Sequence, residues 1–152
     1  DEKIEYMKDV ERALQNRNVR TYMVKAGCGE TYGDKTATGL YDAKAMVAFC
    51  TSTYGEKTGR GWETYRELQY VHQHPEVHLI PVRLHPTYPP RPPDKDGRAL
   101  CDVAFHGSLI PINGLRRGDC EFRPAKEVAE EIIASLKRLG IREDVRLNLP
   151  SR

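Results

Sequence analysis

Glu67 is the side chain in this sequence best placed to do chemistry. It stands between Tyr65 and Leu68, which belong to the apolar face of a helix predicted over 62–74. That helix follows a strongly apolar strand at 45–51, so its first turns are expected at the carboxyl edge of a sheet, where ligands bind. A carboxylate held there could stabilise a positive charge that develops during a reaction. The alternative is an ordinary solvated glutamate, which is what most glutamates on helices are.

Two aromatic residues and a glycine-rich loop are candidates for ligand binding. Tyr54 and Trp62 have broad ring faces on which a flat heterocycle could stack, although packing at the start of the helix is the alternative for Trp62. Gly27, Cys28 and Gly29 lie in a loop whose backbone N–H groups could face a phosphate. Glycine-rich loops are commonly plain turns, and this one lacks the spacing of a dinucleotide fingerprint.

Composition excludes several classes of protein. The chain has 152 residues, with 24 Lys and Arg against 22 Asp and Glu, and a net charge of only +2. A nucleic-acid-binding protein usually carries a basic excess or stripe, which this sequence lacks, so we expect no nucleic acid as a partner. No apolar run approaches the roughly 20 residues of a membrane span. The first residues also lack the basic-then-apolar order of a signal peptide, and we expect a cytoplasmic protein.

The cysteines and histidines do not predict a metal site. A structural zinc site needs close pairs of ligands, and a disulfide scaffold is shorter and richer in cysteine. His72 and His74 are two residues apart, a spacing that points side chains away from each other on a helix. The four cysteines are widely separated, with no Cys-x-x-Cys pair: Cys28, Cys50, Cys101 and Cys120.

Strands and helices are predicted to alternate along the chain. Residues 85–98 hold five prolines and are expected to form an excursion on the surface. Alternating elements are typical of an α/β fold, in which a parallel sheet is covered by helices on both faces. Helices are predicted at 2–18, 62–74 and 124–139, and strands at 19–24, 45–51, 77–84 and 101–112.

Several short motifs in order resemble the Toll/interleukin-1 receptor (TIR) domain family. The run Met46-Val47-Ala48-Phe49-Cys50-Thr51-Ser52-Thr53-Tyr54 is followed, after a glycine-rich gap, by Trp62-Glu63-Thr64-Tyr65-Arg66-Glu67-Leu68. Next come Val77-His78-Leu79-Ile80-Pro81-Val82, Phe105-His106-Gly107 and the last helix. The resemblance covers roughly residues 1–140, and order and spacing carry it more than any one motif. It implies a flavodoxin-like three-layer fold, with a TIR-like domain over 1–142 and a tail or linker over 143–152.

The sequence departs from the family pattern in three places. The family's first strand, which is central in a sheet of order 2-1-3-4-5, is missing, so it lies upstream of Asp1 or another segment fills its place. We predict Val145 to Leu149 as either a short edge strand or the start of a linker. The loop over 27–34 lacks the proline that the family often shows. Glu67 follows Trp62 by five residues where the family places four, which leaves Glu63 as the second choice.

The resemblance implies one of two kinds of function. Some TIR domains cleave the nicotinamide–ribose bond of NAD+, releasing nicotinamide with ADP-ribose or a cyclic form, and use a helix glutamate, here Glu67. For that kind NAD+ is the substrate, no cofactor or metal is needed, and activity depends on self-association. Other TIR domains are non-catalytic signalling adaptors that self-associate. A more distant alternative is an enzyme like the nucleoside deoxyribosyltransferases, which also uses a carboxylate on a layered sheet.

Overall fold

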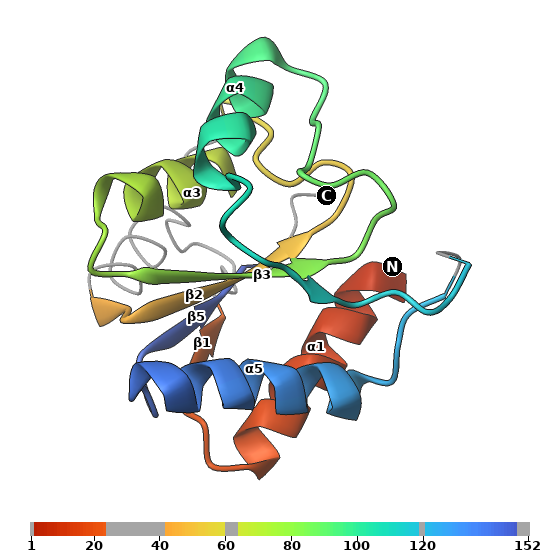
Figure 1. Cartoon of the computed structure of the whole chain (residues 1–152), viewed down its shortest axis with the longest axis vertical. Coiled ribbons are helices and arrows are strands. Elements are labelled where there is room, and N and C mark those ends of the chain that lie inside the picture. Colours follow the sequence, from red (N-terminus) through yellow and green to blue (C-terminus); the bar gives the residue numbers. More distant parts are fainter. Residues whose placement is uncertain (1, 24–41, 60–63, 119–120, 149–152) are drawn as a thin grey trace, which may run out of the picture.

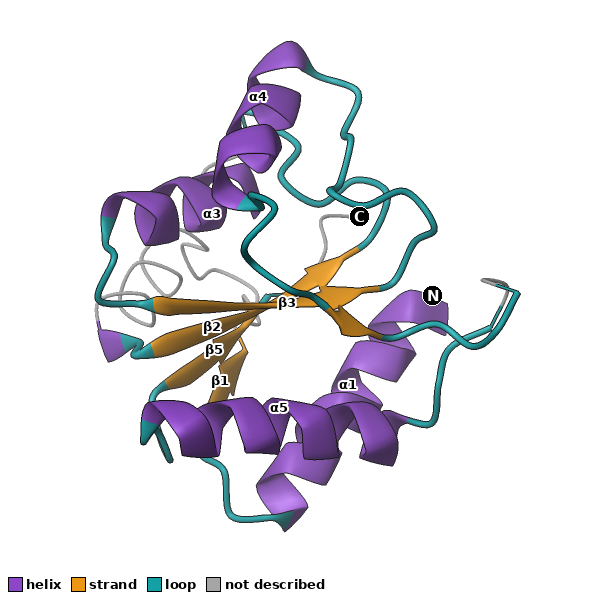
Figure 2. Cartoon of the chain, viewed as in Figure 1, coloured by secondary structure: helices purple, strands orange, loops and turns teal. Residues whose placement is uncertain are grey.

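A computed structural model describes residues 2–23, 42–59, 64–118 and 121–148 of the chain. Their helices and strands run in the order α1 (Glu2–Asn16), β1 (Thr21–Met23), β2 (Ala45–Cys50), α3 (Thr64–Gln73), β3 (His78–Arg83), α4 (Lys95–Ala104), β4 (Ile112–Asn113), α5 (Ala125–Leu139) and β5 (Val145–Leu147). Figures 1 and 2 show the sheet between two layers of helix, with α1 and α5 on one face and α3 and α4 on the other. The expected three-layer α/β fold is therefore confirmed.

The last strand in chain order lies in the interior of the sheet. All neighbouring strands are parallel, in the order β1-β5-β2-β3-β4. Val145 is in register with Thr21 of β1 on one side and with Ala45 of β2 on the other. Because β5 takes the place of the family's first strand, the spatial order is the flavodoxin-like 2-1-3-4-5.

Alternation along β2 divides the core into two parts. Ala45, Val47 and Phe49 face α1 and α5, while Met46 and Cys50 face α3 and α4. Every residue of β2 is buried, as expected of a strand covered on both faces. The apolar run that predicted this strand therefore reflects two separate cores, one on each face.

The predicted helices 2–18, 62–74 and 124–139 are confirmed as α1, α3 and α5. Met7, Val10 and Leu14 of α1 are buried at helical spacing. Gly140 ends α5 in the left-handed conformation, with φ of 72°, and its N–H returns to carbonyls of the last turn. No helix of the described residues is long and apolar enough to cross a membrane.

The strand predicted at 101–112 is wrong. Residues Lys95–Ala104 form α4, and only Ile112–Asn113 pairs with β3. Asp94 caps α4 by accepting a hydrogen bond from the N–H of Gly97 at 2.7 Å. The buried stripe of the helix consists of small residues, among them Gly97 and Cys101, so it lacks the large apolar residues by which a helix is recognised in a sequence.

The position predicted for Val145 to Leu149 is also wrong. We expected an edge strand or the start of a linker, but Val145–Leu147 pairs on both sides and is buried along its whole length. The strand is short, and Arg146 interrupts its apolar residues, so the segment resembles a half-exposed strand in sequence. Its two-sided pairing depends on strands far away in the chain, which no local pattern reveals.

Candidate functional site

The turn between β2 and α3 is fixed by a buried threonine and a constrained glycine. The Thr64 hydroxyl accepts a hydrogen bond from the Gly55 N–H at 2.9 Å, which ties the loop to the first turn of α3. Gly55 has φ of +87°, and a Cβ there would lie 2.6 Å from the Sγ of Cys101 on α4. These contacts join the loop, α3 and α4 at the carboxyl end of β2 in this conformation.

Glu67 lies in this first turn of α3 and is paired with an arginine from β5. Its Oε1 accepts a hydrogen bond from Nη2 of Arg146 at 2.9 Å, although the two residues are 79 positions apart. Their side chains are only 2% and 1% exposed. This is a fully buried ion pair between a helix and an interior strand, not a solvated surface contact.

Several buried polar atoms have no hydrogen-bond partner among the described residues, and three of them belong to the pair itself. They include Oε2 of Glu67 and both Nε and Nη1 of Arg146. Further groups that lack a hydrogen-bond partner within the described chain include the Tyr54 hydroxyl, the Thr51 hydroxyl and Nδ2 of Asn148. Buried polar groups in native proteins are normally satisfied, so the three unpartnered atoms of the pair need an explanation.

The electrostatics of Glu67 result from two opposing effects. Burial raises the pKa of Glu67 above its usual value because desolvation disfavours the carboxylate. The charge and hydrogen bond of Arg146 act in the opposite direction, but burial is the larger effect and the pKa of Glu67 remains raised. The pKa of Tyr54 is raised well above its usual value, first by burial and then by the Glu67 charge.

Arg146 is held by its strand and by an aromatic ring. Its guanidinium carbon lies 5.2 Å from the ring centroid of Tyr22, which is its register partner on β1. Just after the strand, Oδ1 of Asn148 accepts a hydrogen bond from the Phe49 N–H of β2 at 2.7 Å. These contacts fix the carboxyl end of β5 against β2 and place the arginine opposite Glu67.

Of the predicted site residues, Tyr54 and Glu67 fall in the described part of the chain, and both are buried. Tyr54 belongs to the core beneath α3 and α4, while Glu67 is part of α3 itself. The Tyr54 ring is 1% exposed and packs edge-on against Phe105, with centroids 5.8 Å apart. The remaining predicted residues, and the second-choice Glu63, lie outside the described residues: Trp62, Gly27, Cys28 and Gly29.

Sequence reasoning missed Arg146 and Asn148. The available signal was their spacing, because residues two apart in a strand share a face, and both are polar in the run Val145–Leu149. In the edge strand or linker that the run predicts, a charged residue is ordinary and does not indicate a site. A charged side chain that enters an interior strand is better interpreted as a buried partner for an opposite charge.

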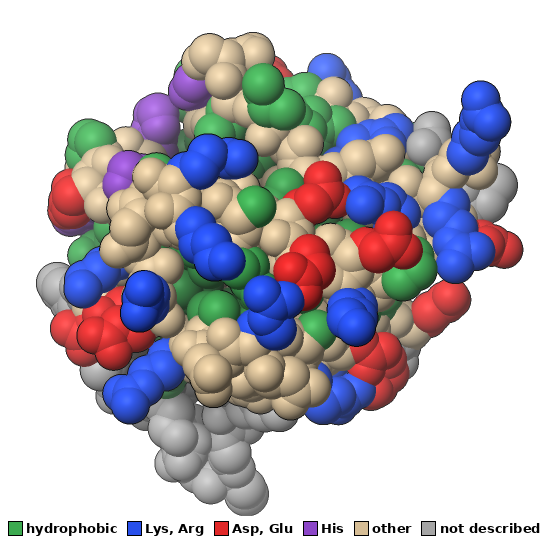
Figure 3. All heavy atoms as spheres, turned by 60° about the horizontal axis from the view of Figure 1, so that its bottom comes forward, with side chains coloured by type: hydrophobic (Ala, Val, Ile, Leu, Met, Phe, Trp, Pro, Cys, Tyr) green, Lys and Arg blue, Asp and Glu red, His purple; other side chains and the backbone are tan. Residues whose placement is uncertain are grey.

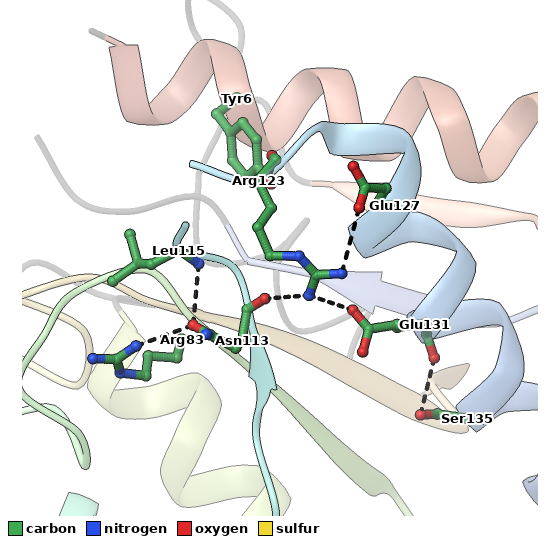
Figure 4. A network of polar contacts seen from close by, with 8 residues as sticks. All are labelled: Tyr6, Arg83, Asn113, Leu115, Arg123, Glu127, Glu131 and Ser135. Atoms are coloured by element: carbon green, nitrogen blue, oxygen red, sulfur yellow. Dashed lines mark hydrogen bonds and ion pairs between the residues drawn. The ribbon is translucent and has the colours of Figure 1, made fainter. Parts of the chain in front are cut away.

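A second polar network lies on the other side of the sheet, near the surface. Arg123 contacts the carboxylates of Glu127 and Glu131 and donates to the Asn113 carbonyl, which joins α5 to β4 (Figure 4). Tyr6 of α1 donates to the Arg123 carbonyl at 2.6 Å. Figure 3, with the bottom of Figure 1 turned forward, shows acidic and basic side chains interspersed over this face.

Two hollows formed by described residues lie away from Glu67. One of about 540 Å³ lies between α1 and α5, and its lining includes Asp9, Arg12 and Glu130. The other, of about 470 Å³, has His72 and His106 in its lining. Among the described residues no group of three or more His, Cys, Asp or Glu side chains is placed to hold a metal ion.

Comparison with known proteins agrees with this architecture. The family model described as TIR domain matches residues 1–112. That range includes α1, β2 and α3 with Glu67, whereas Arg146 of β5 lies outside it. No curated protein and no solved structure matches the chain. The family match covers most of the chain and agrees with its parallel five-stranded sheet, and the chain therefore belongs to the TIR domain family.

Proposed function

We propose that this TIR domain is an NAD+ glycohydrolase whose central group is the carboxylate of Glu67. The observation that supports this most directly is the state of that carboxylate. It is buried at the carboxyl end of β2, one oxygen is bound by Arg146, and Oε2 has no partner among the described residues. An acceptor of that kind suits a ligand with hydroxyl groups, such as the ribose of NAD+.

Energetics favour a functional explanation of the pair over a stabilising one. Taking two charges out of water costs several kcal/mol per ion, and a hydrophobic pair of similar volume is often equally or more stable. A domain that acts only through its outer surface does not need such a pair in its core. Perturbed carboxylates beside a specific charge partner are concentrated at functional sites.

In the proposed reaction the bond between the nicotinamide nitrogen and the ribose C1 breaks. The electron pair leaves with nicotinamide, which becomes neutral, and positive charge develops on the ribose. Glu67 stabilises that charge most strongly where water is excluded. A water oxygen then bonds to C1 and loses a proton to give ADP-ribose, or an adenine nitrogen bonds to C1 to give a cyclic product.

Substrate must reach a carboxylate that is only 2% exposed in this conformation. The start of α3 and the loop before it therefore have to rearrange when NAD+ binds. We propose that self-association, which is general in TIR domains, favours the open arrangement, so that activity rises with protein concentration. In that arrangement Tyr54 and Trp62 would line the base-binding part, and Gly27, Cys28 and Gly29 the phosphate-binding part.

A non-catalytic adaptor is the second candidate, and one observation favours it. Arg146 already neutralises Glu67, and both side chains are shielded from solvent. On this alternative the pair only fixes β5 against α3, and the domain acts by self-association through its surface. We place either form in the cytoplasm, since the two described cysteines, Cys50 and Cys101, are free thiols.

The deciding experiment is NAD+ cleavage at high protein concentration, followed by chromatography of nicotinamide. Wild type is compared with Glu67→Gln, Glu63→Gln and the control Glu76→Gln, which alters an exposed carboxylate beyond α3. We expect a loss on the order of 100-fold or more in Glu67→Gln alone. Loss only in Glu63→Gln would move the role to that residue.

The same samples separate the alternatives to NAD+ cleavage. Absence of nicotinamide release from folded wild type at every concentration would favour the adaptor. Release of free base from nucleosides, but not from NAD+, would point to the deoxyribosyltransferase-like activity. Circular dichroism of each variant shows whether a loss reflects chemistry or unfolding.

A further inference from the structure

We propose that Arg146 is a positioning residue for Glu67, which favours the charged form of the buried side chain and fixes one of its oxygens so that the other serves the substrate. This inference rests on the proposed function, since it assigns a second residue to the same site. It also joins β5, which lies outside the region matched by the family model, to the chemistry of the matched region.

Among the described residues, Arg146 forms an ion pair with one carboxylate, that of Glu67. Nη2 donates to Oε1 of Glu67 at 2.9 Å. No other acidic side chain among the described residues forms an ion pair with this guanidinium. The arginine stands in the interior of the sheet, in register with Tyr22 on one side and Met46 on the other. Because both neighbouring strands fix the backbone of Arg146, its side chain loses little further conformational freedom when it binds Glu67.

The two carboxylate oxygens of Glu67 differ in their hydrogen bonding. Oε1 of Glu67 is fixed by Arg146, while Oε2 has no partner in the described chain. A one-point contact of this type orients the carboxylate without using up its acceptor capacity. A two-point, fork-like pair, which is common between arginine and carboxylates, would have occupied both oxygens.

The positive charge of Arg146 is the second part of its proposed role. Two titratable side chains of the described residues interact with the pair: Tyr54 from the loop before α3 and Tyr22 from β1 beside Arg146. The thiols Cys50 of β2 and Cys101 of α4 act on Tyr54. Burial raises the pKa of Tyr54, Cys50 and Cys101, which favours their neutral forms. Arg146 is therefore the cation that opposes the desolvation of Glu67.

Removal of this cation should convert Glu67 into a neutral acid near pH 7. Burial would then act alone, and it favours the protonated form. A protonated carboxyl carries no charge with which to stabilise a ribosyl cation. The activity of an Arg146 variant should therefore depend on pH in a way that simple loosening of the fold does not produce.

The test compares Arg146→Met with Arg146→Lys and with Arg142→Met, which removes an exposed arginine just before β5. Two quantities are measured: NAD+ cleavage against pH, and the pKa of Glu67 by carbon-13 NMR of its carboxyl group. We expect the acidic limb of the Arg146→Met profile to move up by one pH unit or more, a loss of about tenfold or more on that limb. Arg146→Lys should restore most of the limb, and Arg142→Met should match wild type.

Uniform loss of activity at every pH, with the Glu67 pKa unchanged, would show a merely structural role and overturn the proposal. If Arg146→Met does not fold, Arg146→Gln takes its place, since glutamine can still donate to Oε1 but carries no charge. If wild type releases no nicotinamide, the proposed function fails. The NMR measurement still judges the electrostatic role of Arg146, because an unshifted pKa refutes that role whatever the activity.

Discussion

The two faces of the sheet are built from the same strands but with different chemistry. The core beneath α1 and α5 is apolar throughout, with Val47, Phe49 and Leu147 of the sheet packed against residues such as Ile132. The face toward α3 and α4 includes the buried pair Glu67 and Arg146. Both faces have a hydrophobic core, but among the described residues only the face toward α3 and α4 also has a buried charged pair, which costs stability and points to function on that side.

The largest expected effect comes from breaking the buried pair. Arg146→Met leaves the Glu67 carboxylate without its partner, and we expect the free energy of unfolding at pH 7 to fall by about 3–5 kcal/mol. Urea denaturation followed by circular dichroism measures it. The double variant Arg146→Met/Glu67→Leu should recover most of the loss, because both charges are then removed.

The same variant should show a characteristic pH dependence. Burial already raises the folded-state pKa of Glu67 in the wild type, and Arg146→Met removes the opposing effect of Arg146, so the pKa rises further and the folded protein binds the proton more tightly. Stability contributed in this way is present below the ordinary glutamate pKa and is lost as pH rises through the folded value. A loss of stability that stays constant between pH 4 and pH 8 would contradict an uncompensated Glu67.

A smaller effect is expected where β5 is attached to β2. Asn148→Ala removes the acceptor of the Phe49 N–H, which then remains buried without a partner. We expect a cost of about 1–3 kcal/mol, measured by thermal or urea unfolding. Asn148→Asp retains an acceptor oxygen and serves as the matched variant. Equal stability of wild type and Asn148→Ala would mean that β5 does not depend on this contact.

The apolar face should respond in a different way. Ile132→Val removes one methylene from a fully buried side chain of α5, for which we expect a cost of about 0.5–1.5 kcal/mol. The cost should be independent of pH between 4 and 8, since no titratable group is uncovered. Any change in the pH profile of activity in this variant would show that the two faces are not separable.

The smallest effect is expected for the ion pairs near the surface. Arg123→Met removes contacts to Glu127 and Glu131, whose side chains are 58% and 47% exposed. Exposed pairs contribute about 0–1 kcal/mol, and salt screens them. The difference from wild type should shrink further in 0.5 M salt. A loss as large as that of Arg146→Met would show that exposure does not separate the two networks.

Local pattern was sufficient for most elements, while the catalytic role of Glu67 stays a prediction. Helical spacing located α1, α3 and α5, and a continuous apolar run located β2. Pattern failed at α4, because its buried residues are small, and it failed at β5. The environment of Glu67 could not be predicted, since it depends on Arg146 and hence on a pairing between distant strands. Sequence could name the carboxylate but not its partner.

The place of β5 between β1 and β2 also affects how the domain is assembled. Until the last strand in chain order is available, β1 has no neighbour in the sheet, and one edge of β2 is open. Contacts between residues so distant along a chain are slow to form. An open edge of this kind can meanwhile pair with other chains. During synthesis from the N-terminus, β2 therefore lacks its neighbour β5 until that strand has been made. The ion pair between Glu67 and Arg146 forms only when β5 enters the sheet.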